Sequence, residues 1–197
     1  MKRPWILPAA LVLAAAAFAG VSSARSAPAA ATWSGDTVHS HVLFKIKHLG
    51  TSWSWGRFND FTVGVTANEE GTELTGVEFD VKTASVDTGN AKRDGHLRTP
   101  DFFNAAQFPG ITFKSKSVKA TGETAWDVSG DLTLHGVTRP LTVRVAKVGS
   151  GKGMDGEKLL GLETTFTIKR SDFDMKGSLP AIGDEVMITV AVEAASK

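Results

Sequence analysis

The sequence predicts an all-β fold, a single antiparallel barrel of eight strands with one short helical segment. Three observations lead to this prediction. Apolar and polar residues alternate with a period of two through most of the chain beyond residue 32. Turn-forming stretches such as Asn68–Gly71 separate the alternating segments. The composition, 42% hydrophobic and 22% charged, is that of a globular domain. Short strands with one apolar face favour a barrel or sandwich over a doubly wound parallel sheet.

The composition also excludes several classes of function. A chain of 197 residues fits one domain that buries a substantial core. The absence of cysteine rules out disulfides, thiolate nucleophiles, zinc ribbons, iron–sulfur clusters and a lipid-modified N-terminal cysteine. A formal net charge of +1, with basic and acidic side chains interspersed, gives no basic stripe for nucleic acid.

The first thirty residues are typical of a secretory signal peptide followed by a short leader. Lys2 and Arg3 form a basic start, and an apolar run follows over residues 5–19. A membrane anchor is the alternative, but this run is shorter than the roughly 20 apolar residues that a span needs, and Pro8 interrupts it. We therefore expect export, with a signal peptide at 1–24 (the cleavage site is approximate), a disordered leader at 25–31 and a barrel domain at 32–195.

Eight segments show the alternation, and each predicts one strand with one apolar face. In the first, Lys45 and Lys47 occupy the face opposite the apolar residues. The apolar faces are, in chain order, Val42, Phe44, Ile46; Phe61, Val63, Val65; Val77, Phe79, Val81; Ile111, Phe113; Trp126, Val128, Leu132, Leu134; Leu141, Val143, Val145; Leu160, Leu162, Phe166, Ile168; and Val186, Ile188, Val190, Val192.

One long connection, between about residues 88 and 108, breaks the alternation. It is too long for a hairpin loop without structure of its own. We expect a short helical segment in the connection around residues 89–104, with Pro100 ending the helix. Phe102 and Phe103 would point inward, so the segment would act as a plug across one end of the barrel.

The interior of such a barrel has two interpretations. Eight strands enclose a space that side chains just fill or that holds one slender ligand. The inward residues are almost entirely hydrocarbon, which suits a packed core and an apolar chain equally well. Alternation alone does not distinguish a filled barrel from a hollow one.

The chain resembles the YceI-like family over residues 33–194. Each block is weak by itself, but all of them occur in the family's order. They are Trp33–Ser40 followed by Phe44 and His48, Gly56–Phe58, Ser85–Asn90, Arg93–Leu97, Asp101–Phe103, Phe108–Phe113, Gly130–Pro140, Arg170–Phe173 and Ile182–Val186. Two features depart from the pattern: Asp174 stands where the family usually has a small residue, and the pair Trp53 and Trp55 is outside it. Either could alter a rim or a ligand preference.

The resemblance implies a lipocalin-like barrel in the periplasm that holds a polyisoprenoid or similar amphiphile in its lumen. Combined with the alternation, it favours a hollow barrel. Individual contacts are not marked by the family motifs, so the expected lining follows from the alternation. The expected ligand-binding residues are Phe44, Ile46, Phe61, Val63, Phe79, Val81, Phe102, Phe103, Phe113, Trp126, Leu132, Leu134, Val143, Phe166, Ile168, Ile188 and Val190.

The polar clusters are interpreted as structural. The five histidines lack metal-ligand spacing, so we expect no metal site, and His39, His48 and His135 are expected to be hydrogen-bonded at strand ends. No nucleophile motif accompanies Arg93 and Asp94. We expect these two residues to tie the plug to the barrel by charge-assisted hydrogen bonds. Arg170 and Asp172 are interpreted in the same way, with Arg139 as a further candidate partner.

We therefore expect a lipid-binding protein without catalytic residues or cofactors, other than a bound isoprenoid or quinone-type lipid. Its role would be transport, storage or sequestration of that lipid. The alternative is an enzyme or stress-response redox protein that acts on the lipid headgroup through His39, Asp94 or His96. A third reading is a purely structural or interaction barrel. The expected partner is an amphiphilic lipid rather than nucleic acid, and transient membrane contact and a homodimer are left open.

Overall fold

The computed structural model describes residue 1 and residues 30–196. The predicted signal peptide lies outside the described residues except for Met1. The strands are β1 (Ala30–His48), β2 (Ser52–Phe58), β3 (Phe61–Asn68), β4 (Leu74–Lys82), β5 (Val86–Asp87), β6 (Gly110–Ala120), β7 (Ala125–Leu134), β8 (Val137–Lys152), β9 (Lys158–Lys169) and β10 (Ile182–Ser196). The helices are α1 (Ala91–Leu97) and two short 3₁₀ helices, η1 (Thr83–Ser85) and η2 (Arg170–Phe173).

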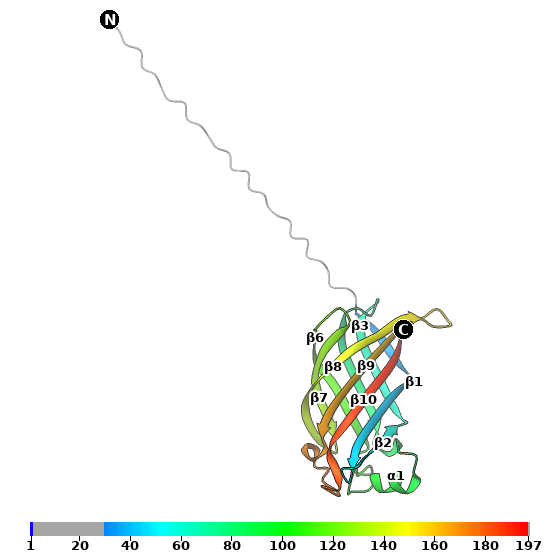
Figure 1. The fold of residues 1–197 in the computed structure, drawn as a ribbon. Helices are drawn as coiled ribbons and strands as arrows, with labels where there is room; N and C mark the ends of the chain where they lie inside the picture. Colours follow the sequence, from blue (N-terminus) through cyan, green and yellow to red (C-terminus); the bar gives the residue numbers. More distant parts are fainter. Residues whose placement is uncertain (2–29, 197) are drawn as a thin grey trace.

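The strands form a closed antiparallel barrel, as the sequence predicts (Figure 1). Eight of them follow one another in the order β10-β9-β8-β7-β6-β4-β3-β1, and β1 pairs with β10 to close the ring. The predicted inward phase holds along β1 and β10, where Val42, Phe44 and Ile46 pair with Val190, Ile188 and Val186. Because a closed ring has no free edges, the barrel leaves little unpaired backbone for other chains to add to.

Strand β2 and the two-residue strand β5 lie outside this ring and were not predicted. The 19-residue strand β1 pairs with β3 near its start, over Ala30–Ser34, and with β2 near its end, over Val42–His48. The pattern of β2 is inverted relative to the other strands. Trp53 and Trp55 are exposed, and the residues between and after them are Ser54 and Gly56; the strand's third large apolar residue, Phe58 at its end, is buried.

Strand β1 begins at Ala30, within the segment that the sequence assigns to the leader. Ala30 and Ala31, which were assigned to the disordered leader, belong to β1 and pair with Asn68 and Ala67 of β3. Backbone pairing with β3 orders these two small residues even though they carry no alternation signal of their own. The last strand extends to Ser196, one residue beyond the predicted boundary.

The two ends of the barrel differ in construction. At one end, which we call the hairpin end, only the short loops 69–73, 121–124 and 153–157 connect strands. At the other, the helix end, the long connections 83–109 and 170–181 cover the barrel, and α1 lies there as expected (Figure 1). The side chain of Asn90 accepts a hydrogen bond from the Arg93 amide and so caps α1.

The packed part of the core lies toward the hairpin end. Trp33, Val65 and Leu160 are each 1% exposed, and Ala194 is fully buried. Trp126, on β7 near the same end, is 3% exposed. These side chains fill the barrel interior and close it at this end. Among the described residues, no helix is long and apolar enough to cross a membrane.

Candidate functional site

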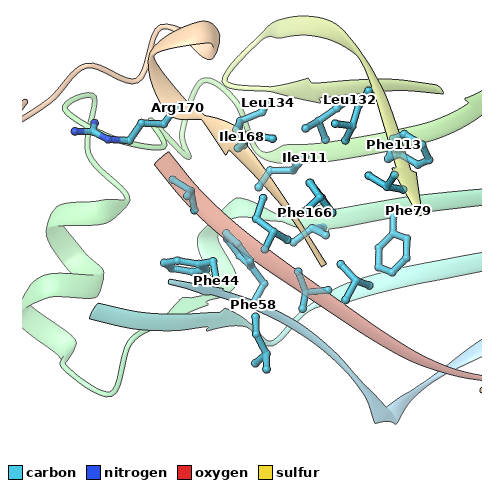
Figure 2. Close-up of a pocket in the computed structure, with 18 of the residues that line it drawn as sticks. Phe44, Phe58, Phe79, Ile111, Phe113, Leu132, Leu134, Phe166, Ile168 and Arg170 are labelled. Atoms are coloured by element: carbon cyan, nitrogen blue, oxygen red, sulfur yellow. The ribbon is translucent and has the colours of Figure 1, made fainter. Parts of the chain in front are cut away.

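The barrel interior contains a cavity of about 190 Å³ on the helix-end side of the packed core. Figure 2 shows its lining, in which aromatic and branched aliphatic side chains from strands around the barrel converge on one space. Side chains with polar groups contribute only at Thr112, Thr164 and Arg170. The cavity therefore offers a hydrocarbon surface, suited to an apolar ligand.

Most of the predicted ligand-binding residues line this cavity. They come from seven of the eight ring strands and from the part of the plug that follows α1, which contributes Phe102 and Phe103. The predicted residues found in the lining are Phe44, Ile46, Phe79, Val81, Phe102, Phe103, Phe113, Leu132, Leu134, Val143, Phe166, Ile168, Ile188 and Val190.

Three predicted residues lie in the packed core and not in the cavity wall: Phe61, Val63 and Trp126. The ring of Phe61 stacks on that of Phe79, which lines the cavity, with centroids 6.4 Å apart. A Cβ atom at Gly35 would lie 2.7 Å from Val63 Cβ, which shows how closely β1 packs over that side chain. Trp126 lies near the hairpin end of β7, outside the cavity lining. Alternation gives the face of a strand but not the depth along the barrel, so the sequence did not separate these three residues from the cavity lining.

Fifteen further residues, which the sequence did not predict as ligand-binding, also line the cavity. Several share the apolar phase already recognised in the sequence, so alternation could have included them. Others come from β2, from α1 or from the segments around η2, where no period of two marks the inward direction. The full set is Val42, Leu43, Phe58, Val77, Leu97, Ile111, Thr112, Val128, Leu141, Val145, Thr164, Arg170, Met175, Ile182 and Val186.

Solvent accessibility changes along the barrel axis. Some inward-facing residues of the cavity, such as Phe44, Phe113 and Ile188, remain partly accessible, although others, such as Val128, are buried. The inward-facing residues of the hairpin end, such as Val65 and Leu160, are almost completely buried. The free volume therefore lies between the packed core and the coverings of the helix end.

Arg170 bounds the cavity at the helix end (Figure 2). Its side chain is buried, and its guanidinium donates to the carbonyl oxygens of Gly183 (2.9 Å), Met175 (2.7 Å) and Ile182 (3.0 Å). The guanidinium also lies 5.8 Å from the centre of the Phe102 ring. Burial lowers the pKa of Arg170 from its usual value. Arg170 thus ties η2 to the start of β10, which supports a structural role.

Asp172 is not the partner of Arg170. Its carbonyl oxygen accepts a hydrogen bond from Nε of Arg139, at 3.1 Å, so Arg139 does join this segment as the sequence suggested. His135 supports the same region, since its Nδ1 lies 3.1 Å from the carbonyl oxygen of Phe173. The residue after η2, Asp174, adopts a left-handed conformation with φ of 59°, which an aspartate tolerates better than most residues.

The polar residues of the plug also have structural partners. The buried carboxylate of Asp94 accepts hydrogen bonds from the amide and the hydroxyl of Thr88, at 2.9 and 2.5 Å. Arg93 donates to the same hydroxyl, at 2.7 Å, and Arg98 donates to the carbonyl oxygen of Ala84, at 2.7 Å. These bonds join α1 to the segment before it. Arg98, which the sequence analysis did not consider, makes the connection to η1.

The candidate catalytic residues do not meet in one site. His96 pairs with Asp101, at 3.1 Å, and not with Asp94. His39 lies on β1, where its Nδ1 is 2.7 Å from Asp36 and 3.7 Å from Glu193. The hydrogen bond that the His39 ring donates to the Asp36 carboxylate raises the pKa of His39. These three side chains could offer ligands to a divalent cation, because their ligand atoms lie within 4.8 Å of one another. They form a solvent-exposed ion-pair cluster on the outside of the barrel.

The sequence was compared with known proteins. The model of the YceI-like domain matches residues 33–194. The chain belongs to the YceI-like family. Protein YceI of Escherichia coli O157:H7 is 43% identical over 155 residues, which cover 79% of this chain and 81% of that protein.

Solved structures of YceI-like proteins have the same fold. The YceI protein of Campylobacter jejuni is 33% identical, with a TM-score of 0.70 over 78% of this chain and 91% of that chain. A polyisoprenoid binding domain from Saccharophagus degradans has a TM-score of 0.65 over 84% of this chain and 98% of that one. Its identity is 19%, so this second likeness supports the fold alone.

Proposed function

We propose that this YceI-like protein is a periplasmic lipid-binding protein that holds a polyisoprenoid or quinone-type chain in the barrel lumen. Transport, storage or sequestration of that lipid would be its role. The observation that supports this best is the hydrocarbon-lined cavity between the packed hairpin end and the covered helix end. The description of the Saccharophagus degradans domain as polyisoprenoid binding supports the ligand class.

Binding would arise from burial of the apolar chain. Each CH₂ group removed from water contributes about 0.8 kcal/mol, so several carbon atoms in the cavity give useful affinity without a charged contact. The one ionised side chain in the lining is Arg170, and three of its N–H groups already donate to backbone carbonyls. The lining thus has the properties needed to hold a ligand, and we propose that it does so without converting it.

The volume of the cavity bears on how a long chain would fit. A protein cavity of about 150 Å³ accepts benzene, so 190 Å³ accommodates roughly one isoprene unit. The rest of a longer chain would extend through the helix end or displace lumen side chains. The rings of Phe44, Phe58 and Phe103 are candidates for displacement, because they pack on one another at centroid distances of 5.6 and 5.4 Å beside the cavity.

The alternative of an enzyme acting on a lipid headgroup has weaker support. His39, Asp94 and His96 each have a different partner, and none of them lines the cavity. A headgroup reaction would need at least one of them near the reacting atoms. We therefore propose carriage of the lipid over chemical conversion.

Native mass spectrometry of protein recovered from a bacterial periplasm tests this proposal. We expect a second population whose extra mass is released by organic solvent and matches an isoprenoid or quinone-type lipid. Protein stripped of lipid should take up added polyprenol with one-to-one stoichiometry. A protein that carries no lipid and also fails to take up polyprenol would overturn the proposal.

A further inference from the structure

The outer face of the β1–β2 hairpin carries large apolar side chains that contact solvent. Trp53 and Trp55 are 42% and 55% exposed, and they point away from the lumen. Leu49, in the turn between the two strands, is 61% exposed. Leu179, 38% exposed, lies on the neighbouring connection, and the Leu49 amide donates to the carbonyl oxygen of Ala181 at 2.7 Å. The apolar groups of the hairpin and of this connection are thus held next to each other.

Two lysines complete this surface. Lys45 pairs in register with Trp55, and Lys47 pairs with Trp53. The ammonium of Lys47 lies 4.4 Å from the Trp53 ring centre, and that of Lys45 lies 4.9 and 5.0 Å from the rings of Trp53 and Trp55. Within the described part of the chain neither lysine forms an ion pair with a carboxylate. No carboxylate of the described residues therefore neutralises these two charges, which lie over the tryptophan rings at the outer surface.

We call these residues the docking patch. Tryptophan, with an apolar body and a polar N–H, is the side chain enriched where membrane proteins meet the headgroup region. Lysines beside it add attraction to anionic lipid, about 1 kcal/mol for each one near the surface. Exposed leucines supply apolar area that a bilayer can bury. The docking patch consists of Lys45, Lys47, Leu49, Trp53, Trp55 and Leu179.

The docking patch adjoins the cavity. Phe44 and Ile46, which alternate with Lys45 and Lys47 along β1, point inward and line the lumen. Ile182, which pairs with His48 at the end of β1, also lines it. The patch is thus on the outer surface of the β1–β2 hairpin, whose inward residues line the cavity. Figure 1 shows this hairpin at the helix end of the barrel.

We propose that the docking patch binds the surface of a membrane that contains anionic lipids, and so places the helix end of the barrel against the bilayer. The docking itself does not depend on what the lumen holds. Its purpose, transfer of the apolar ligand between bilayer and lumen, rests on the proposed function.

Vesicle binding of the full-length exported protein tests the docking. The probes are vesicles of phosphatidylcholine with or without phosphatidylglycerol, and dibrominated lipid serves as a tryptophan quencher. We expect the wild type to prefer phosphatidylglycerol vesicles, and bound protein to lose part of its tryptophan fluorescence. The double variant Trp53→Ser/Trp55→Ser should bind about tenfold more weakly, and Lys45→Gln/Lys47→Gln should lose the preference for phosphatidylglycerol.

The opposite end of the barrel offers a matched control. Val148 and Met154, in β8 and the loop after it, are the large exposed apolar residues of the hairpin end, at 71% and 101%. The variant Val148→Ser/Met154→Ser removes two apolar side chains and should leave vesicle binding unchanged. Every variant keeps the same N-terminal residues, so differences in binding report the substituted surface.

Three results would overturn the docking: no binding of the wild type to either vesicle, equal binding by the Trp53→Ser/Trp55→Ser variant, or an equal loss in the hairpin-end control. Binding only to native membranes, and not to pure lipid, would also overturn it, in favour of a protein partner. Polyprenol uptake in solution is measured separately. Loss of uptake with vesicle binding intact would contradict the proposed function alone.

Discussion

The ring of Phe44 lies against the backbone of Gly56 on the neighbouring strand, so closely that the position leaves no room for a side chain. A Cβ atom added at Gly56 would come within 2.7 Å of Cε1 of Phe44 and closer still to Cζ. The two residues are direct partners in the β1–β2 pairing. Gly56 therefore determines where the Phe44 ring sits in the cavity wall.

Replacement of Gly56 by alanine should force the Phe44 ring toward the lumen. We expect Gly56→Ala to lower the free energy of unfolding by about 1–3 kcal/mol, as overpacking does in other cores. Urea unfolding measures this. The control is Gly64→Ala on β3, where the nearest atom to an added Cβ is 4.0 Å away, and its unfolding free energy should change by less than about 0.5 kcal/mol. Equal effects in both variants would contradict the packing described for Gly56.

A bulky residue in the lumen should block the ligand. Ile188 faces the cavity, and its neighbour Met187 on β10 faces outward, opposite Lys45. We expect Ile188→Trp to lower polyprenol affinity about tenfold or more, because the indole occupies space that two or more CH₂ groups would fill. Met187→Trp should leave affinity unchanged.

Fluorescence titration with a polyprenol analogue distinguishes the two variants. If Ile188→Trp lowers only the thermal stability and never alters uptake, the barrel is a packed structural core and not a carrier.

Removal of the Arg170 guanidinium should loosen the helix end. Arg170→Met leaves three carbonyl oxygens without their donors, and we expect a loss of about 2–5 kcal/mol in unfolding free energy. Hydrogen exchange should accelerate over residues 170–183. Arg144→Met is the control, because Arg144 forms an exposed ion pair with Asp127, and such pairs contribute about 0–1 kcal/mol. A stable Arg170→Met variant with unchanged exchange would show that the three hydrogen bonds do not hold η2.

Asp87 should titrate well below an ordinary aspartate. The Gly89 amide, the Asn59 side chain and the Arg57 guanidinium donate hydrogen bonds to its carboxylate and lower its pKa to about 2. Because the pKa of Asp87 in the folded protein is lowered below 3.8, the usual value for an aspartate, the stabilisation from these hydrogen bonds is fully present above pH 3.8. It is lost as the pH falls toward 2.

Carboxyl NMR shifts as a function of pH report this pKa directly. In Asn59→Ala, which removes one donor, the pKa of Asp87 should rise toward 3.8. A wild-type midpoint already near 3.8 would mean that these hydrogen bonds do not persist in solution.

The barrel itself could be predicted because a period of two is visible in the chain wherever one face is buried. The apolar side chain of Phe44 and the charged side chain of Lys45 indicate which residue faces the barrel interior and which faces solvent. Strand β2 was not predicted because it lacks the alternation of inward apolar and outward polar residues. Its inward position Gly56 has no side chain, and Trp53 and Trp55 point outward. Phe58, the last residue of β2, is its one large apolar residue on the inward face, and a single such residue makes no alternating pattern.

For the candidate site, the sequence predicted which face of each strand points inward, but not how far along the barrel axis each residue lies. Trp126 and Leu132 share one phase of β7, yet Trp126 fills the hairpin end and Leu132 lines the cavity. Depth follows from the register of neighbouring strands, which one strand's pattern does not contain. Arg170 and Met175 lie in and after η2, and only the folded chain shows that these residues bound the lumen.

Isotope-edited NMR of the protein with a ¹³C-labelled isoprenoid tests the central claim most directly, because it locates the ligand. If the ligand binds in the lumen, nuclear Overhauser effects should connect the isoprenoid to the methyl groups of Val143, Ile168 and Ile188. None should connect it to Val65 or Leu160 in the packed hairpin end. Contacts confined to the outer surface, or none with any lumen methyl group, would contradict it.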